Sequence, residues 1–472
     1  MTTPHSNCIP ASGIVAGRLS PEQYAENFSD AAPPLKDTEA VIEAERCYYC
    51  HDAPCIRACP ADINIPSFIH RIAQDNLRGA AEAILSENPL GGMCARVCPT
   101  ETLCEQACVR NTQDSRPVKI GLLQRYATDH LMNHPGRPLF ERQSPTGKRV
   151  AIIGAGPAGL TVAHRLAQRG HDAVIFDARP KAGGLNEYGL AAYKTTDGFA
   201  QREIEWLLSI GGIELRLGQR LGSDFTLDQL RRDYDAVFLG LGLAGFNALD
   251  LAGDQAQGVM EAVDFIAGLR QAADFAEVPV GRNVVVIGGG MTAVDAAVQA
   301  RKLGARRVTM AYRRGEHDMK ASEYERELAR RNGVHILFWA KPIQIHSEQG
   351  RVTALSFRLS EPATGQDRSD VTDEILTLPA DMVLKAIGQS YLPLSAGTDS
   401  LALAQGRIAI DSQGRTSLPG VWAGGDCCAG GLDLTVDAVR DGKIAARAID
   451  IALSESAGSD AAWTCEKEYL HG

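Results

Sequence analysis

The sequence predicts an α/β protein, with a small all-helical domain first and two β–α–β domains after it. Two observations carry this prediction. Eight of the twelve cysteines lie between residues 47 and 108, among segments whose apolar side chains recur with a helical period. Two glycine-rich turns, beginning at Gly154 and Gly288, each follow an apolar strand and open a helix. We therefore expect the chemistry of this chain at the cysteines and at the two glycine turns.

Length and composition limit the class of protein. With 472 residues, 47 glycines and 44% hydrophobic residues, the chain is long enough for about three compact domains. Its net charge of −10 argues against a nucleic acid as partner. No apolar run approaches the roughly eighteen residues that cross a membrane, and the N-terminus shows no export signal. We expect a cytoplasmic protein with no membrane segment.

The cysteines form two blocks of four. The first reads C-x2-C-x4-C-x3-C-P and the second C-x3-C-P-x4-C-x3-C. A disulfide framework needs an oxidising compartment, for which the sequence gives no signal. Structural zinc usually uses two Cys-x2-Cys pairs, and only Cys47 and Cys50 have that spacing. Close cysteines followed by a Cys-Pro are typical of paired [4Fe–4S] clusters, and we expect two clusters here.

In such a pair, the cysteine before proline crosses to the neighbouring cluster. Cys59, which precedes Pro60, therefore belongs to the second cluster, and the pseudo-symmetry of the two blocks makes Cys108 a ligand of the first. The fourth ligand of the second cluster stays open between Cys94 and a residue further along the chain. Assigned in this way, the first cluster takes Cys47, Cys50, Cys55 and Cys108, and the second takes Cys59, Cys98 and Cys104.

The stretch from Cys47 to Thr128 resembles the amino-terminal domain of dihydropyrimidine dehydrogenase. The segments that carry the resemblance are CHDAPC, CPADINIPSFI, ENPLGGMCARVCPTETLC and IGLLQRYAT. In that family the fourth ligand of the second cluster is a glutamine in an I-G-x-L-Q segment, which residues 120–124 reproduce at the same spacing from Cys108. The resemblance implies that Gln124 is this ligand and that Cys94 is not.

The first glycine turn has the complete surroundings of a dinucleotide-binding fingerprint. The strand Arg149–Ile153 leads into it, a helix over 160–169 leaves it, and a second strand ends on Asp177. Glycines here let the backbone approach a pyrophosphate at the helix N-terminus, and the acidic residue accepts hydrogen bonds from the adenosine ribose. The residues assigned to this site are Gly154, Ala155, Gly156, Pro157, Ala158, Gly159 and Asp177.

Companion motifs indicate which dinucleotide binds. Gly183-Gly184-Leu185 follows the acidic residue, and far downstream Gly424-Gly425-Asp426 ends a strand before a helix expected over 435–446. This combination resembles the FAD domains of flavin disulfide reductases and glutamate synthases. The resemblance implies that Asp426 binds the ribityl chain of FAD and that the helix starting at Thr435 faces the isoalloxazine. It also makes the second β–α–β domain an insertion between the two halves of a Rossmann-like FAD domain.

The second fingerprint follows the strand Asn283–Ile287. The next strand, over 307–312, ends on basic residues where a free ribose hydroxyl would need an acidic one, and arginine suits a 2′-phosphate. The pattern favours NADPH, with NADH as the alternative if the basic residues form an ordinary solvated charge run with Glu316 and Asp318. The residues assigned to this site are Gly288, Gly290, Met291, Thr292 and Ala293, with Arg313, Arg314 and Lys320 for the phosphate.

Shorter segments complete the flavin and nicotinamide regions. In the resembled family, the turns Phe238–Gly242 and Ala386-Ile387-Gly388 link the two domains and line the nicotinamide. Residues 185–194 (LNEYGLAAYK) replace the usual I-P-x-F-R-L-P-type segment, so the resemblance places Lys194 beside the isoalloxazine. The adjacent Cys427 and Cys428 lack the spacing of a redox disulfide, and Cys8 and Cys465 are expected to be spare thiols.

These assignments divide the chain into four parts. We expect an extended N-terminal arm over 1–36, a helical iron–sulfur domain over 37–145, an FAD domain over 146–280 and 386–472 (including a polar tail), and an NAD(P) domain over 281–385. The apolar stripe of Ile65, Phe68, Ile69 and Ile72 is one of those that predict the helical domain.

The order of these parts predicts electron input. A flavin connects the two-electron chemistry of a hydride with the one-electron chemistry of the clusters, and no side chain is assigned a catalytic role. The chain has no second flavin site, so the electrons must pass to another protein. Resemblance to the electron-input subunit of bacterial dihydropyrimidine dehydrogenase implies a hetero-oligomer with an FMN-containing subunit that reduces uracil or thymine.

Two alternatives stay open. The small subunit of glutamate synthase shares this architecture, although it typically has glutamate at the position of Gln124. A non-catalytic iron–sulfur binding protein is the other alternative, and two intact glycine fingerprints argue against it.

Overall fold

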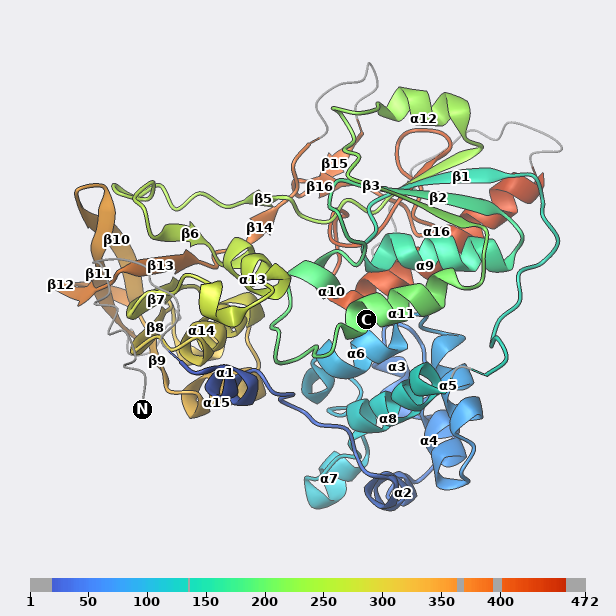
Figure 1. Cartoon of the computed structure of the whole chain (residues 1–472), viewed down its shortest axis with the longest axis horizontal. Helices are drawn as coiled ribbons and strands as arrows, with labels where there is room; N and C mark the ends of the chain where they lie inside the picture. The colour runs from blue at the N-terminus through green and yellow to red at the C-terminus, as the bar shows by residue number, and fades with distance from the viewer. Residues whose placement is uncertain (1–18, 135, 363–368, 394–400, 456–472) are drawn as a thin grey trace, which may run out of the picture. The chain divides into compact units, whose positions relative to one another are not determined.

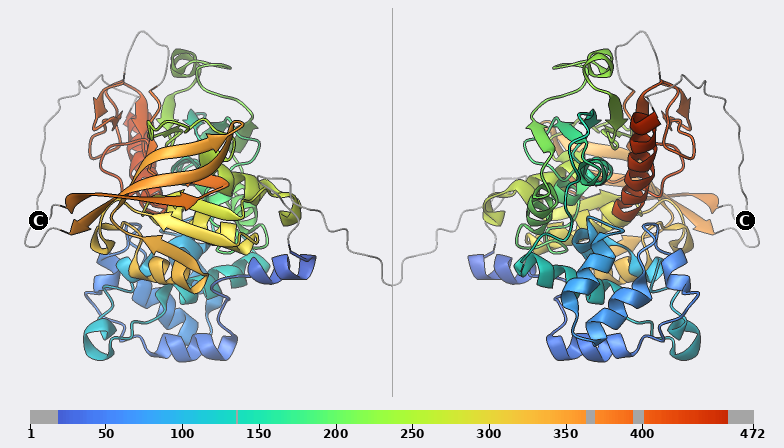
Figure 2. Two further views of the ribbon diagram at one scale, coloured as in Figure 1. Left: turned by 90° about the vertical axis from the view of Figure 1, so that its left-hand side faces the viewer. Right: turned by 90° about the vertical axis from the view of Figure 1, so that its right-hand side faces the viewer.

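The structure is a computed structural model that describes residues 19–134, 136–362, 369–393 and 401–455. The chain forms two compact units (Figure 1, Figure 2). The cysteine unit consists of residues 34–186, 198–245 and 390 onward. The insert unit consists of the residues up to 33 together with 187–197 and 246–389. Each unit contains a parallel sheet, and the predicted α/β fold class is confirmed.

The cysteine domain within the first unit is built from short helices. The buried side chains of α4 are Ile65, Phe68, Ile69 and Ile72 with Pro66, so the predicted apolar stripe faces the core. The eight cysteines lie on α3, on α6 and on the loops around them. The helices are α2 (Asp37–Glu45), α3 (Pro54–Arg57), α4 (Ile65–Ala73), α5 (Leu77–Leu85), α6 (Gly91–Val97), α7 (Arg110–Asp114) and α8 (Ile120–Asn133), with a 3-10 turn at Thr100–Thr102.

The FAD-type sheet of the cysteine unit has five parallel strands in the order β17-β4-β1-β2-β3. Val421 of β17 pairs with Val237 of β4, so the late strand completes the sheet that the first fingerprint begins. Helices α9, α11 and α16 lie between this sheet and the helices of the cysteine domain (Figure 1). The elements are β1 (Arg149–Ile153), α9 (Pro157–Gln168), β2 (Asp172–Asp177), α10 (Leu185–Tyr188), α11 (Phe199–Leu208), β3 (Ile213–Leu217), α12 (Leu227–Asp233), β4 (Ala236–Leu239), β15 (Leu403–Ala404), β16 (Arg407–Ile408), β17 (Val421–Ala423) and α16 (Thr435–Glu455).

The cysteine domain and the FAD-type sheet share one apolar core. Ile69 and Leu123 of the helical part belong to the same cluster of buried side chains as Ile152 of β1 and Val439 of α16. Lys443 of α16 adds polar contacts to this packing, because its Nζ donates to the carbonyl oxygen of Ala61 at 2.8 Å and pairs with Glu87. The two predicted domains therefore form one packed body.

The insert unit contains a second five-stranded parallel sheet, in the order β6-β13-β7-β8-β9. A separate three-stranded antiparallel sheet, β10-β11-β12, shares an apolar core with it, and Figure 2 shows these strands in orange. The elements of the insert unit over these residues are β6 (Val259–Glu261), α13 (Ala262–Gln271), a 3-10 turn (Phe275–Glu277), β7 (Asn283–Ile287), α14 (Met291–Lys302), β8 (Arg307–Ala311), a 3-10 turn (Glu316–Asp318), α15 (Glu323–Arg331), β9 (Val334–Leu337), β10 (Ala340–Glu348), β11 (Arg351–Pro362), β12 (Ser369–Pro379) and β13 (Met382–Lys385). The short strands β5 (Gly245–Phe246) and β14 (Gln389–Ser390) lie where the chain passes between the units.

The N-terminal arm expected to be extended over 1–36 is partly helical. Its helix α1 (Pro21–Asn27) begins with a capping box at Ser20. Tyr24 and Phe28 are one helical turn apart, and both are buried in the apolar core of the insert unit because they face it together. Asn27 also donates a 2.8 Å hydrogen bond to the carbonyl oxygen of Lys302. Cys8 and Cys465 lie outside the described residues.

No helix among the described residues is long and apolar enough to cross a membrane. The expected cytoplasmic location stays a prediction.

Candidate functional site

The first cysteine cavity brings together thiols from three segments of the chain. Cys47 and Cys50 follow α2, Cys55 lies in α3, and Cys108 precedes α7. All four line one cavity, and all four are half-buried. The rest of its wall is mostly apolar, with Ile65, Ile69, Val118 and Ile120 among its members. These are the four residues predicted to hold the first cluster.

A second cavity contains the residues predicted for the second cluster. Its wall includes Cys59, Cys98, Cys104 and Gln124, and also Cys94. Gln124 projects from α8 and only 7% of it is exposed. Its Nε2 donates a 2.7 Å hydrogen bond to the carbonyl oxygen of Gly91, so the amide oxygen is the side-chain atom that is available to a ligand. Cys94 is buried beside Cys98, so the cavity contains both candidates for the fourth position.

The donor sets of the two cavities fit [4Fe–4S] clusters. Burial raises the pKa of Cys55 to about 12, and it also raises the pKa of Cys59 and of Cys104, so without a positive partner these thiols stay protonated. Among the described residues, no three His, Cys, Asp or Glu side chains converge on a point that would suit a single metal ion. A cubane does not need such convergence, because each thiolate binds a different iron.

The first glycine turn has a backbone that only glycine tolerates. Gly154 has φ +105°, and a Cβ there would lie 2.1 Å from the carbonyl oxygen of Gly240. Asp177 accepts hydrogen bonds from the backbone nitrogens of Ala155 (2.7 Å) and Arg179 (2.8 Å), which hold its carboxylate at the turn. Gly184 packs against Gly156, so the Gly183-Gly184 segment adjoins the fingerprint. This arrangement is the one that a pyrophosphate and an adenosine ribose need.

The late Gly-Asp motif lies beside the first turn of α9. A Cβ on Gly425 would lie 3.2 Å from Cβ of Ala158, which places the two predicted FAD contacts together. Burial raises the pKa of the neighbouring Asp426 to about 6. At the start of α16, Thr435 Oγ1 donates a 2.7 Å hydrogen bond to Asn186 Oδ1, the residue after Leu185. The next residue, Val436, lines the second cysteine cavity, so the first turn of α16 reaches from the predicted flavin site to that cavity.

The second glycine turn lies in the insert unit with the predicted nicotinamide segment. A Cβ on Gly288, where φ is +147°, would lie 2.3 Å from the carbonyl oxygen of Ala386. Asn247 donates from its backbone nitrogen to the oxygen of Gly388 and from Nδ2 to the oxygen of Ile387, both at 3.1 Å. A Cβ on Gly290, at the N-terminus of α14, would meet nothing within 4 Å. The helix N-terminus is therefore open to a ligand phosphate.

The basic residues after β8 are exposed. Arg313, Arg314 and Lys320 all face solvent. Glu316 pairs instead with Arg330 at 2.5 Å and with Arg326 at 3.4 Å. Asp318 accepts a hydrogen bond from the backbone nitrogen of Gly315. The two acidic residues of this segment thus have partners other than the three predicted phosphate ligands.

Lys194 lies in the insert unit, and not in the FAD-type part where it was expected. Only 14% of its side chain is exposed, and its Nζ lies 2.7 Å from both Asp295 of α14 and Glu325 of α15. Burial lowers the pKa of Lys194, and the two carboxylates raise it. The effect of the carboxylates is the larger, so the net shift of the pKa is upward. The ammonium is therefore held by two carboxylates, and its predicted place beside the isoalloxazine stays untested. Neither carboxylate was foreseen from the sequence.

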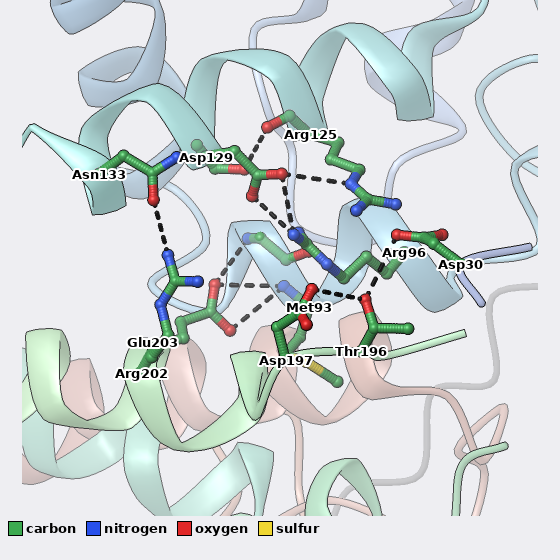
Figure 3. Close-up of polar contacts among 12 residues, drawn as sticks. Asp30, Met93, Arg96, Arg125, Asp129, Asn133, Thr196, Asp197, Arg202 and Glu203 are labelled. Carbon is green, nitrogen blue, oxygen red and sulfur yellow. Dashed lines mark hydrogen bonds and ion pairs between the residues drawn. The ribbon is translucent and has the colours of Figure 1, made fainter. Parts of the chain in front are cut away.

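Glu203 is a second residue that sequence reasoning missed. It is fully buried, and Figure 3 shows it reaching from α11 to the start of α6, where it accepts hydrogen bonds from Gly92 and Met93. The signal was present, because Glu203 lies in line with the buried Ala200, Ile204 and Leu207 on one face of the helix. An acid in an apolar stripe indicates a specific partner.

Comparison with known proteins identifies the family. The sequence profile of the pyridine nucleotide-disulphide oxidoreductases matches residues 148–442, more than half of the chain. The chain belongs to this family. A second profile, dihydropyrimidine dehydrogenase domain II with its 4Fe–4S cluster, matches residues 24–135.

Similar proteins span nearly the whole chain. The small chain of glutamate synthase [NADPH] from Escherichia coli (strain K12) is 36% identical over 448 residues, which cover 89% of this chain and 93% of that protein. The NAD-dependent dihydropyrimidine dehydrogenase subunit PreT from Salmonella typhimurium (strain LT2) is 35% identical over 437 residues, which cover 92% and 98%. Mycobacterium tuberculosis FprA in complex with NADPH has the same fold at 18% identity, with a TM-score of 0.56 over 66% of this chain and 86% of that one.

The protein is thus an NAD(P)H-dependent oxidoreductase of the flavin and iron–sulfur type, and the predicted class of enzyme is confirmed. Its cofactors are FAD and a 4Fe–4S centre of the kind named for the matched domain, with NAD(P)H as the electron donor. The predicted resemblance to the pyrimidine enzyme and to glutamate synthase is confirmed as well.

Proposed function

We propose that this chain is the electron-input subunit of a dihydropyrimidine dehydrogenase. In this function, hydride passes from NADPH to FAD, and single electrons pass through two [4Fe–4S] clusters to an FMN-containing partner that reduces uracil or thymine. FAD supplies the change from two-electron to one-electron chemistry when it is bound. The residues of this chain hold the cofactors in sequence.

The observation that carries the proposal is the position of Gln124. Its side chain lines the cavity that also contains Cys59, Cys98 and Cys104, and its amide nitrogen is engaged by the carbonyl oxygen of Gly91. That hydrogen bond uses the nitrogen end of the amide, which supports the neutral oxygen as the atom that would bind iron. A glutamine ligand at this place in the chain is the feature that the resemblance to dihydropyrimidine dehydrogenase implies.

The geometry of the cysteine unit also supports an order for the two clusters. Val436 joins the flavin-facing helix α16 to the second cavity, so we assign the second cluster to the position nearest the flavin. Cys59 and Cys104 of that cavity are buried, whereas all four cysteines of the first cavity are half-buried. We therefore assign the first cluster to the exit, where a partner protein can approach.

NADPH is the proposed donor because three exposed cations follow β8. The acidic side chains nearby pair with Arg326 and Arg330 or cap a turn, so they leave Arg313, Arg314 and Lys320 for a 2′-phosphate. The relatives differ in this respect, since the glutamate synthase is named for NADPH and the pyrimidine subunit for NAD.

The small subunit of a glutamate synthase is the second candidate. Two facts favour it: the identity to the E. coli small chain, 36%, is as high as that to the pyrimidine subunits, and its named donor is NADPH. In that case the partner would be a large glutamate-forming subunit. The two functions share every cofactor of this chain and differ in the protein that takes the electrons.

Reconstitution separates the candidates. The purified chain should contain one FAD and about eight iron atoms, and with NADPH it should reduce ferricyanide but not uracil. Adding the FMN-containing pyrimidine subunit should restore uracil reduction, and adding a large glutamate synthase subunit should not yield glutamate. If glutamate forms and uracil is not reduced, the chain is the small subunit of a glutamate synthase. Failure of NADPH to bleach the flavin would refute both.

A further inference from the structure

We propose that the side chain of Asn88 donates a hydrogen bond to an inorganic sulfide of the cluster in the second cavity and thereby raises the reduction potential of that cluster. The inference rests on the proposed function, because it requires a cluster in that cavity. Asn88 itself is not a ligand in any assignment made above.

Asn88 has an unpaired donor at the cavity wall. The residue is completely buried and lines the second cavity. Its Nδ2 is one of the buried side-chain nitrogens for which the described residues provide no hydrogen-bond partner, cysteine sulfurs included. Leaving a buried amide unpaired costs free energy, and such groups in native proteins usually have a partner. A sulfide of the cluster supplies an acceptor in the cavity.

The orientation of this amide is fixed by the backbone. Asn88 Oδ1 accepts a 3.0 Å hydrogen bond from the backbone nitrogen of Leu90, which identifies the oxygen end of the side chain. The same pattern is an Asx turn, and it joins α5 to α6. The backbone nitrogen of Asn88 donates to Ile84 at 2.9 Å, and its oxygen accepts from Gly91 at 2.9 Å. The donor is therefore held rigidly, as tuning of a cluster requires.

The turn also connects Asn88 with Gln124. The backbone N–H of Gly91 donates a hydrogen bond to the carbonyl oxygen of Asn88. The carbonyl oxygen of Gly91 accepts a hydrogen bond from Nε2 of Gln124. One short segment thus positions both amides at the second cavity. A neutral ligand and an N–H donor act in the same direction, because each favours the more negative reduced cluster and raises its potential.

Substitution by serine tests the donor without removing the turn. In Asn88→Ser, the hydroxyl can still accept from Leu90 but is too short to replace the amide at the cluster. The matched control is Asn76→Ser, since Asn76 Oδ1 accepts from the nitrogen of Gly79 at the start of α5 and Asn76 does not line the cavity. We expect full iron content in both variants, and a lower potential for the second cluster, in titrations followed by electron paramagnetic resonance, only in Asn88→Ser. An unchanged potential with full iron content would overturn the inference.

A measurement on the unaltered protein covers the case in which Asn88→Ser loses its cluster. Asn88 is the only asparagine among the described residues that line this cavity. Protein labelled with 15N in asparagine side chains should show a 15N coupling to the reduced second cluster, and absence of that coupling refutes the hydrogen bond. If the unaltered protein contains no cluster in the second cavity, the proposed function fails first, whereas an intact cluster without coupling refutes only the role of Asn88.

Discussion

Glu203 Oε1 accepts a 2.6 Å hydrogen bond from the backbone nitrogen of Gly92. The same carboxylate accepts from Met93 at 3.2 Å, so α11 of the FAD-type part is tied to the first turn of α6 (Figure 3). Helix α6 leads to Cys98 and also supplies the Gly91 carbonyl that engages Gln124. A Cβ on Gly92 would lie 2.4 Å from the ring of Phe199, so the close approach of the two helices needs glycine there.

Glu203→Gln should remove a pH dependence of stability. Burial raises the pKa of Glu203 to about 8, against the opposing hydrogen bonds from Gly92 and Met93 and the charge of Arg96. A raised folded pKa gives stability that is fully present below the unfolded value of 4.5 and is lost as the pH rises through 8. Glutamine keeps an acceptor for both amides and does not ionise. The unfolding midpoint of the variant should therefore fall less than that of the unaltered protein between these two pH values.

The burial of Glu203 sets the size of its pH effect on stability, and an exposed glutamate provides the control. The shift corresponds to at most about 5 kcal/mol, at roughly 1.4 kcal/mol for each pKa unit. Glu214→Gln is the matched control, because Glu214 lies at the surface beside Arg216 and its pKa is lowered. Thermal unfolding at a series of pH values measures all three proteins. Equal pH profiles for the unaltered protein and Glu203→Gln would contradict the prediction.

Lys194→Met should destabilise the insert unit strongly. The change leaves the carboxylates of Asp295 and Glu325 buried with no cation between them. Removing one member of a buried ion pair typically costs about 3–5 kcal/mol, which denaturant unfolding would detect. Lys148→Met is the control, because its pair with Asp235 lies at the surface, partly exposed to solvent, and should be worth less than about 1 kcal/mol. Adding Asp295→Asn to Lys194→Met should recover part of the loss, and no recovery would contradict an electrostatic cause.

Replacing Arg313 and Arg314 by alanine should change the choice of donor. Both side chains are exposed after β8, and a hydrogen bond to a charged group contributes about 1.5–3 kcal/mol. The KM for NADPH should therefore rise roughly tenfold or more, while the KM for NADH changes little. Arg330→Ala is the control, because Arg330 pairs with Glu316 in the same region. Equal effects of the double substitution on both donors would identify the arginines as ordinary surface charge.

The sequence predicted most of what depends on local pattern. Four cysteines line each cavity. Both glycine turns join a strand to a helix as expected, although α9 begins at Pro157, before the predicted residue 160. Strand β7 has the predicted limits Asn283–Ile287, whereas α16 continues to Glu455, beyond the predicted residue 446. Helix ends depend on tertiary packing, and the apolar side of α16 packs along α9.

What the sequence did not reveal are contacts between residues far apart in the chain. The partners of Lys194 lie about a hundred residues or more downstream, and Glu203 contacts a backbone nitrogen, which has no sequence signature. Asn88 looks like an ordinary Asn-Pro turn, and only the cavity reveals its unpaired donor. Such contacts are set by how elements pack, for which a local pattern contains no information.

Gln124→Glu should lower the reduction potential of the second cluster. Gln124→Glu keeps the length of the side chain but puts a carboxylate where the neutral amide oxygen stands. The added negative charge should make the cluster harder to reduce and lower its potential. Electrons would then be held at the flavin: NADPH should still reduce FAD rapidly and the iron content should remain, while turnover with the partner subunit falls. Stopped-flow absorbance, iron analysis and a redox titration measure these three properties.

Two alanine variants decide whether Gln124 or Cys94 is the ligand. Both side chains line the second cavity, and both are buried. If Gln124 binds iron, Gln124→Ala should perturb the spectrum of the second cluster, whereas Cys94→Ala should leave its iron in place, because that thiol only adjoins Cys98. The reverse result, with iron lost in Cys94→Ala and an unchanged spectrum in Gln124→Ala, would make the second cluster an all-cysteine site. It would also remove the observation that favours the pyrimidine enzyme over glutamate synthase, since the two families differ at this ligand.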